Sequence, residues 1–410
     1  MSTQGEPGRA MLFVGPYPPP FGGIASHIRD VSADFSRSGI RCHILTFVAD
    51  ADSVDGTRNN LTVERRRIRP TAGAWRGALA RLHRLPLLLP LFLKLPLPHT
   101  FVSALLRCLH IVDVCRANRL GTVGIYGSEE AVLVPILRRL MPRLRIFYTC
   151  FAAPLTKPDY YRRYKRYYEL AMRQADRVLA SSRYCGGAAQ WLAPGLEVEV
   201  IYYGVDLEKY HPRTPRLMRE RESGLEGKIV VLFLGRMIPD MGAPEALEIA
   251  RAVNARRADT VFFIAGAKGS HTEVIEKAAA ESGGRIRCRV NVPADELAGA
   301  YASADIVLAP TADRQACMGL AIKEAFASGT PVAVSNSGGI PEAVEHGVQG
   351  IMIPITGEGR IDVPAFVEAL DRMCDDVAGR RVMGERARQR AEELFDQRIT
   401  MTRVRQVYGF

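Results

Sequence analysis

The sequence lacks the cysteine pattern of a disulfide scaffold or of a zinc-binding domain. Its 410 residues include eight cysteines, which are scattered, form no C-x-x-C pair and make no Cys/His cluster with zinc spacing. No signal peptide is recognisable before the first predicted strand. Together these absences predict reduced thiols in a cytoplasmic protein.

Acidic residues are fewer than basic ones. The 44 Asp+Glu against 55 Lys+Arg leave a formal net charge of +11. This excess favours anionic partners such as nucleic acid, phosphorylated small molecules or an acidic membrane surface. No basic platform interleaved with aromatic residues and no nucleic-acid-binding motif is present, so we expect no nucleic-acid partner.

No uninterrupted apolar run is long enough to span a membrane, which takes about 20 mostly apolar residues. Residues 82–112 come nearest, but four prolines and Lys94 interrupt them, and seven arginines lie between residues 65 and 84. Apolar surface beside arginines is typical of a segment that lies on an anionic leaflet. A buried helical hairpin with a solvated basic face explains the same composition, and the sequence leaves both interpretations open.

What is present is an alternation of short apolar strands and helical stretches. Runs such as IVVLFL (229–234) and VFFIA (261–265) are apolar at consecutive positions, as in parallel strands buried on both faces. Two such series predict an α/β protein with two doubly wound, Rossmann-like domains and a cleft between them. We expect these domains over 1–205 and 206–389, with a C-terminal helix of about 390–410 that packs back on the first.

Three glycine- or arginine-bearing loops follow predicted strands, where doubly wound sheets bind ligands. Gly22 and Gly23 precede a helix expected over 24–38, and adjacent glycines let backbone amides approach an anion. They do not form G-x-G-x-x-G, so a nicotinamide site is weakly supported. Arg236 follows the strand 229–234, where a cation suits phosphate.

The third loop opens a helix expected over 319–328. The amides of Gly319, Leu320 and Ala321 are free at its first turn and suit a phosphate. Glu324 lies one turn further along, where a carboxylate can accept hydrogen bonds from ribose hydroxyls. This segment predicts a nucleotide site.

Several motifs together resemble the retaining nucleotide-sugar glycosyltransferases of family 4, which have the GT-B fold. The similar segments are GPYPPPFGGIASHI, IYYGVDLEKYHP, FLGRMIPDMG and GLAIKEAFASGTPVAVSNSGGIPEAVEHGVQGIMIP, together with the last 21 residues, RAEELFDQRITMTRVRQVYGF. The resemblance covers nearly the whole chain, is strongest over 229–354 and is weak over 50–145.

The resemblance implies a role for each of the residues already singled out. Gly22 and Gly23 would lie near the donor diphosphate and the acceptor, Arg236 and the amides of 319–321 would contact the diphosphate, and Glu324 would bind the ribose. It also implies retention by front-face attack, a nucleotide sugar as substrate, and no metal or cofactor. The acceptor would be a glycan, a lipid-linked or a small molecule, as in cell-surface polysaccharide or glycoconjugate biosynthesis.

Four positions depart from the family pattern. Ala316 stands where the first acid of the E-x7-E motif is expected, and Met241 stands where a lysine is expected. Cys150 or Phe151 occupies the place of a histidine, and Tyr203 replaces an asparagine. Each lost charge-assisted contact can remove about 3–4 kcal/mol of transition-state stabilisation. The alternative is therefore a catalytically inactive partner or assembly protein at the membrane surface.

A stretch rich in tyrosine and arginine, residues 160–173, has helical spacing. We expect an amphipathic helix with half-buried tyrosines and solvated arginines. The same face could contact an anionic acceptor such as a lipid-linked diphosphate glycan.

Overall fold

The computed structural model describes residues 9–18, 22–48, 53–67, 98–314 and 317–410. By its internal contacts the chain divides into unit 1, Met1–Ile201 with Met401–Phe410, and unit 2, Tyr202–Thr400. The sequence predicts the boundary four residues later. The resemblance to glycosyltransferases also assigns the acceptor to the first domain and the nucleotide-sugar donor to the second; these roles, and the cleft between the domains, stay predictions.

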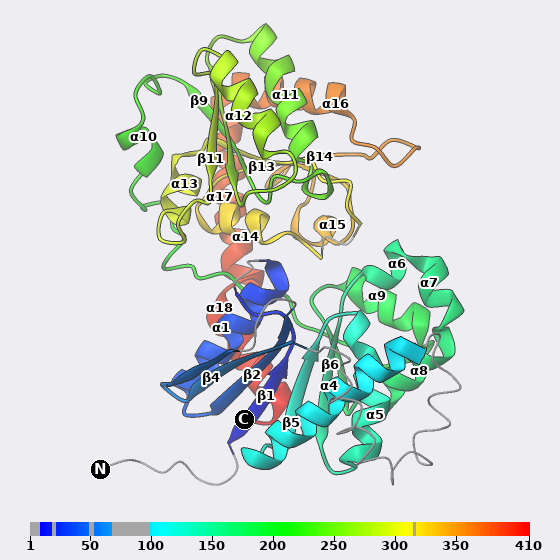
Figure 1. The fold of residues 1–410 in the computed structure, drawn as a ribbon. Coiled ribbons are helices and arrows are strands. Elements are labelled where there is room, and N and C mark those ends of the chain that lie inside the picture. Colours follow the sequence, from blue (N-terminus) through cyan, green and yellow to red (C-terminus); the bar gives the residue numbers. More distant parts are fainter. Residues whose placement is uncertain (1–8, 19–21, 49–52, 68–97, 315–316) are drawn as a thin grey trace. The chain divides into compact units, whose positions relative to one another are not determined.

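Unit 1 is built on an eight-stranded sheet in the order β3-β4-β2-β1-β5-β6-β7-β8 (Figure 1). Every neighbouring pair is parallel except β3 and β4. The strands are β1 (Ala10–Val14), β2 (Arg41–Val48), β3 (Ser53–Arg58), β4 (Leu61–Arg67), β5 (Thr122–Tyr126), β6 (Arg145–Cys150), β7 (Arg177–Ala180) and β8 (Glu199–Val200). The sequence analysis missed β3 and β4, which lie where the family resemblance is weak.

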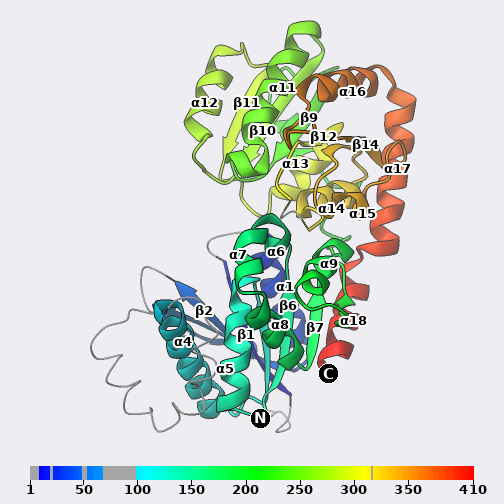
Figure 2. The ribbon, with the colours of Figure 1, turned by 90° about the vertical axis from the view of Figure 1, so that its right-hand side faces the viewer.

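Helices cover both faces of this sheet (Figures 1 and 2). Leu12 and Val14 of β1 enter a core shared with α4, α5, α8 and α9, while Phe13 contacts Phe35 of α1 on the opposite face. The helices are α1 (Gly23–Arg37), α4 (Pro98–Ala117), η2 (Glu129–Val132), α5 (Leu133–Leu140), α6 (Ala153–Thr156), α7 (Pro158–Arg163), α8 (Lys165–Gln174), α9 (Arg183–Leu192) and the end of α18 (Gln397–Tyr408).

The last ten residues complete the core of unit 1. Tyr408 is fully buried, and its hydroxyl lies 3.0 Å from that of Tyr126. Its ring centre lies 4.3 Å from that of Phe147, and an Arg145 nitrogen donates to its carbonyl at 3.1 Å. Burial raises the pKa of Tyr126 to about 12, so its hydroxyl stays neutral at ordinary pH.

A buried carboxylate fastens α4 to the sheet. Glu64 of β4 accepts from His43 of β2 at 3.0 Å, from His110 of α4 at 2.7 Å and from Arg66 at 2.6 Å. The hydrogen bonds from His110 and His43 hold the pKa of Glu64 well below its usual range. Glu64 therefore stays ionised at neutral pH and joins two strands to one helix.

Unit 2 contains a six-stranded parallel sheet in the order β11-β10-β9-β12-β13-β14. Its strands are β9 (Ile229–Leu234), β10 (Thr260–Gly266), β11 (Ile286–Val290), β12 (Ile306–Ala309), β13 (Val332–Ser335) and β14 (Gly350–Ile353). The two runs predicted as strands of this unit, 229–234 and 261–265, match β9 at both ends and β10 to within one residue at each end. The prediction works here because strands buried on both faces are apolar throughout.

The helices of unit 2 form two layers (Figure 2). Val230 and Leu232 of β9 pack with α13, α14 and α17, whereas Val231 and Phe233 pack with α11, α12 and α16. The helices are α10 (Leu217–Arg221), η3 (Pro239–Met241), α11 (Ala243–Arg256), α12 (Thr272–Glu281), α13 (Leu297–Ser303), α14 (Leu320–Ala327), α15 (Ile340–Ala343), α16 (Val363–Asp375) and α17 (Val377–Leu394).

The stretch expected as one amphipathic helix forms two. α7 ends at Arg163 and α8 begins at Lys165, with Tyr164 between them. Tyr161, Tyr167 and Tyr168 are buried more deeply than expected, while the arginines of this stretch are exposed. The amphipathic pattern is confirmed, and the single helix is wrong.

Candidate functional site

In unit 2 the chain changes direction across the sheet between β9 and β12. It runs outward from β9 through β10 to β11, and then returns to place β12 on the other side of β9. Loops that leave the carboxyl ends of two such strands diverge, and open α/β sheets bind ligands at this point. Arg236 follows β9 and Gly319–Ala321 follow β12, so both predicted phosphate contacts leave this point.

The two loops also touch each other. The Thr311 hydroxyl donates to the Asp240 carbonyl at 2.8 Å. Gly242 has a φ of +79°, and a side chain there would begin 2.1 Å from the Pro310 carbonyl oxygen. Only glycine therefore allows the loop after β9 to approach the loop after β12 this closely.

Arg236 is exposed, and the structure gives its guanidinium no partner among the described residues. The backbone beside it is fixed, because the Met237 amide donates to the Ala267 carbonyl at 3.0 Å. A cation held at the end of a strand and left without a partner is available to an anionic ligand.

The helix α14 begins directly after Gly319, which has a φ of +74°. Leu320 is exposed and Ala321 is half-buried, so the first turn lies at the surface of the unit. The first amides of a helix lack partners within it and carry partial positive charge. These three residues are therefore placed as the sequence predicts for an anion contact, and their role stays a prediction.

Glu324 is buried on α14, and its Oε2 accepts from the Tyr301 hydroxyl at 2.8 Å. Tyr301 is fully buried on α13, and burial together with Glu324 raises its pKa well above its usual value. The tyrosine is therefore a permanent donor that fixes the carboxylate. Nothing in the local sequence signals this contact, because Tyr301 belongs to a different helix.

In unit 1 the corresponding reversal lies between β1 and β5. Gly22 and Gly23 follow β1 and begin α1. Gly22 is extended, with a φ of −176°, and a side chain at either position would meet no described atom within 4 Å. The backbone conformation thus does not demand glycine at 22, and the role of the pair stays a prediction.

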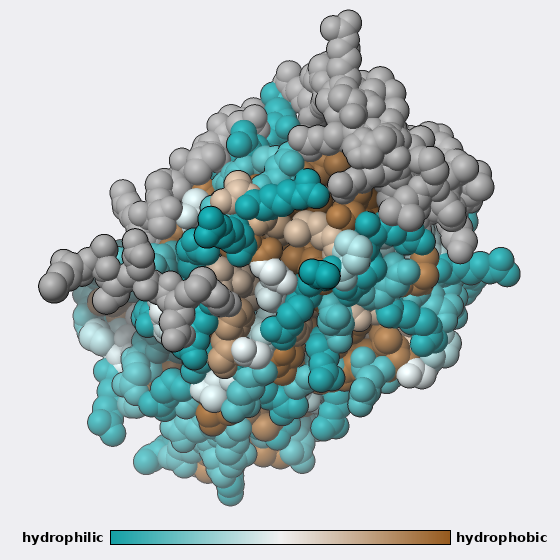
Figure 3. Space-filling model, turned by 90° about the horizontal axis from the view of Figure 1, so that it is seen from below, coloured by the Kyte–Doolittle hydropathy of each residue, from teal (hydrophilic) through white to brown (hydrophobic). Residues whose placement is uncertain are grey.

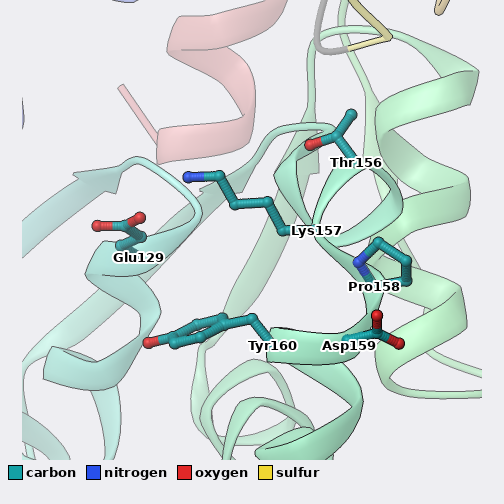
Figure 4. A pocket seen from close by; sticks show the side chains of 6 residues that line it. All are labelled: Glu129, Thr156, Lys157, Pro158, Asp159 and Tyr160. Atoms are coloured by element: carbon teal, nitrogen blue, oxygen red, sulfur yellow. The ribbon is translucent and has the colours of Figure 1, made fainter.

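A cavity of about 470 Å³ lies near the carboxyl ends of β5 and β6. We call it the β5–β6 cavity; it is lined by Glu129, Thr156, Lys157, Pro158, Asp159 and Tyr160 (Figure 4). Glu129 begins η2 after β5, and the other five residues follow β6. The sequence analysis did not single out Glu129, Thr156, Lys157 or Asp159 as site residues, because no motif connects them.

Comparison with known proteins identifies the domain built around Arg236 and Gly319. Residues 228–376 match the family described as glycosyl transferases group 1. The matched residues all lie in unit 2 and make up most of it. The predicted resemblance is confirmed at this level, since the match covers all six strands of the sheet that carries the switch point.

Curated relatives match the chain as well, although only in part. The chain is 34% identical over 260 residues to the D-inositol 3-phosphate glycosyltransferase of Salinispora tropica, covering 59% of this chain and 52% of the relative. It is 30% identical over 219 residues to a GDP-mannose-dependent phosphatidylinositol monomannoside mannosyltransferase of Mycolicibacterium smegmatis, covering 51% and 56%. The chain thus spans about half the length of the curated relatives it matches.

Solved structures show the fold of the whole chain. Sucrose-phosphate synthase of Thermosynechococcus elongatus gives a TM-score of 0.78 at 17% identity and covers 98% of both chains. HepE of Anabaena, solved in complex with UDP-glucose, gives 0.72 at 18% identity, with 97% and 98% covered. The chain has the α/β GT-B fold, as the sequence predicts.

The departures from the family pattern have different structural settings. Ala316 lies outside the described residues, as does Gln315. Met241 packs against the apolar cluster between the sheet and α11, α12 and α16. It therefore takes part in packing and offers no charge where the glycosyltransferase pattern has a lysine.

Of the other two departures, the first is buried and the second is half-buried. Cys150 is fully buried at the end of β6, and Phe151 is 7% exposed. Neither side chain can therefore make the polar contact that an accessible histidine would make at this position. The carbonyl of Tyr203 accepts from the buried ammonium of Lys323 at 2.8 Å, which ties the start of unit 2 to α14. The structure thus assigns packing or anchoring contacts to these residues.

Proposed function

We propose that the chain is a retaining glycosyltransferase that moves a sugar from a nucleotide-sugar donor to a glycan, lipid-linked or small-molecule acceptor. The observation that carries this is the placement of Arg236 and the start of α14 on the two loops that flank the switch point of a group 1 glycosyltransferase domain. A switch point with an unpartnered cation and free helix amides suits a diphosphate.

Within this proposal Arg236 and the amides of residues 319–321 hold the diphosphate, and Glu324 binds the ribose. The proposed role of Gly22 and Gly23 is to lie near the donor diphosphate and the acceptor, attack occurs on the front face, and the leaving diphosphate helps to accept the proton. No metal and no cofactor takes part. In the part of the chain that is described, no group of three or more His, Cys, Asp or Glu side chains is arranged to hold a metal ion, and metal independence stays a prediction.

The comparisons support only the class of the donor, a nucleotide sugar, and not its base or its sugar. The HepE structures were solved with UDP and UDP-glucose, and the mycolicibacterial relative is named as GDP-mannose-dependent. We therefore propose a nucleotide sugar without naming the base. Purified protein should be screened by thermal shift against UDP-, GDP-, ADP- and dTDP-sugars, followed by assays of hydrolysis and of transfer to an acceptor extract.

The outcome separates an enzyme from an inactive partner protein. Met241 and Cys150 remove polar groups that a catalytic site of this family would use, and this favours the partner as second candidate. A protein that neither binds nor turns over any nucleotide sugar, with its native acceptor extract supplied, contradicts the enzyme and leaves the partner.

Peripheral attachment to the inner face of an anionic membrane is part of the proposal. Its support is the arginine cluster and the apolar run over 65–112, of which residues 68–97 lie outside the described residues. The described end of the run forms α4, whose Cys108, Ile111 and Val112 are buried in the core of unit 1, so α4 itself does not support attachment. Among the described helices none is long and apolar enough to cross a membrane. On the face shown in Figure 3 apolar side chains gather in patches between hydrophilic ones.

The described arginines of the cluster all have partners in the fold: Arg66 donates to Glu64, Arg65 donates to the Pro18 carbonyl at 2.8 Å, and Arg67 is not free either. Attachment would therefore depend on the arginines further along. Flotation with anionic liposomes should show binding at low salt that weakens as the Debye length falls from about 10 Å at 0.1 M to about 3 Å at 1 M. No flotation at low salt contradicts attachment and favours the buried hairpin.

A further inference from the structure

The β5–β6 cavity combines an exposed aromatic ring with both charge signs. Figure 4 shows Lys157 and Tyr160 extending toward the side where Glu129 lies, with Asp159 and Pro158 at the opposite end. Its volume of about 470 Å³ is within the range of about 300–1,000 Å³ that is typical of small-molecule sites. The cavity belongs to unit 1 alone.

The charges of the cavity do not suit an anion. Glu129 and Asp159 are carboxylates, and Lys157 is the only cation among the lining residues. Asp159 pairs with Arg162 at 3.2 Å, but both side chains are largely exposed, so this pair neutralises little. A phosphate placed beside Lys157 would thus lie near two negative groups.

The backbone is also unfavourable for an anion. α7 begins with Pro158, which has no amide proton, and it carries Asp159 in its first turn. α6 ends at Thr156, so the partly negative carbonyl end of a helix borders the cavity. Anion sites have the opposite arrangement, with free amides or arginines directed at the ligand.

Tyr160 supplies an apolar surface. It is 42% exposed, and the centres of the Tyr161 and Tyr164 rings each lie 5.1 Å from its own in an edge-to-face arrangement. Two neighbouring rings thus hold it in place at the surface. A ring fixed in this way loses little side-chain freedom when a ligand packs on it.

From this combination we infer that the β5–β6 cavity binds an uncharged, hydroxyl-rich ring, that is, an unphosphorylated sugar of the acceptor. The inference rests on the proposed function, since it assigns the acceptor class. The C–H face of the sugar packs on Tyr160, its hydroxyls donate to Glu129 and Asp159, and Lys157 and Thr156 donate to its oxygens. A lone phosphate finds one cation there and two repelling carboxylates.

The test measures binding of defined probes to the full chain by saturation-transfer-difference NMR and calorimetry. The probes are methyl glucoside, methyl mannoside and methyl N-acetylglucosaminide, with inositol 1-phosphate and inorganic phosphate as the anionic arm. We expect at least one glycoside to bind at millimolar concentration and inorganic phosphate not to displace it. Tighter binding of inositol 1-phosphate than of every glycoside, lost in Lys157→Met, overturns the inference.

Single substitutions of lining residues test whether the glycoside binds in the β5–β6 cavity. Tyr160→Ala should weaken glycoside binding about fivefold, and Tyr160→Phe, which keeps the ring, should remain within about twofold of the parent. Glu129→Gln should weaken it by a similar factor because a charged acceptor is lost. Glu273→Gln, an exposed glutamate on α12 of unit 2, is the matched control and should change nothing. Unchanged binding in Tyr160→Ala overturns the assignment to this cavity.

The measurements distinguish failure of this inference from failure of the proposed function. Nucleotide-sugar binding, measured by thermal shift, depends on unit 2 and should persist in Tyr160→Ala and Glu129→Gln. If nucleotide sugars bind and no glycoside does, the inference is wrong and the proposed function stands. If no nucleotide sugar binds and none is turned over, the proposed function itself fails.

Discussion

The two units differ in the segments that leave the carboxyl ends of their strands. In unit 2 the loops after β9 and β12 touch, and Gly242 lies too close to Pro310 for any side chain. In unit 1 the segments after β5 and β6 leave the β5–β6 cavity open. Loops in close contact restrict which residues fit, whereas an open cavity accepts many side chains. The part matched by the glycosyltransferase family, residues 228–376, lies accordingly in unit 2.

The largest effect that tests this comparison is expected at Glu324. Glu324→Ala should lower nucleotide-sugar turnover about a hundredfold, because hydrogen bonds between a carboxylate and ribose hydroxyls are each worth about 1.5–3 kcal/mol. Steady-state kinetics and thermal shift with the best donor measure this. Because Glu324 also accepts from buried Tyr301, circular dichroism must first show that the variant folds.

Tyr301→Phe is the companion variant at this position. It removes the donor that orients Glu324 but leaves the carboxylate, so we expect a smaller loss of turnover than in Glu324→Ala. Turnover in Glu324→Ala equal to that of the parent, in a folded protein, removes Glu324 from the site. The proposal that the closed loops of unit 2 form the nucleotide-sugar site, in contrast to the open cavity of unit 1, would then lose its main support.

A smaller effect, on stability, is expected in unit 1. Glu64→Gln should lower the free energy of unfolding by about 2 kcal/mol at pH 7, because charged hydrogen bonds from His43, His110 and Arg66 are lost. Urea titrations of the parent, of Glu64→Gln and of Glu197→Gln, an exposed control, measure this. A Glu64→Gln protein as stable as the control contradicts the proposed anchoring of α4.

The pH dependence of this difference follows from the lowered pKa of Glu64. The unfolded glutamate titrates near 4.3, and the folded one titrates lower. The folded state thus binds fewer protons between these values, so the stabilisation is fully present above the unfolded pKa and is lost as pH falls toward the folded one. The gap between parent and Glu64→Gln should be constant near neutrality and shrink below about pH 4.

The smallest effect is expected at Arg236. Arg236→Ala should weaken nucleotide-sugar binding about tenfold through one lost charge-assisted contact. Its melting temperature should match the parent's, since the side chain is exposed and has no described partner. Arg251→Ala, an exposed arginine on α11, controls for the change in net charge. Equal nucleotide affinity in Arg236→Ala and the parent removes Arg236 from the site.

Much of unit 2 could be predicted from local sequence, because the apolar pattern of its strands agrees with their burial in the sheet. A strand such as IVVLFL is buried on both faces and is therefore apolar at each position. By contrast, β4 contains Glu64, Arg65 and Arg66, and the partners of Glu64 and Arg65 lie far away in the chain. A strand of this kind has no apolar period, and the sequence analysis missed it together with β3.

The sequence by itself determined the α/β class, the two doubly wound units and the positions of Arg236, Gly319 and Glu324, because each depends on strand and helix patterns within a few residues. Only the tertiary structure decided that Tyr301 holds Glu324, that Met241 serves packing, and that residues from the ends of β5 and β6 line one cavity. Tyr301 and Glu324 are 23 positions apart, and Glu129 is on a different segment from the other residues of the cavity, so these contacts depend on how the strands are ordered in each sheet.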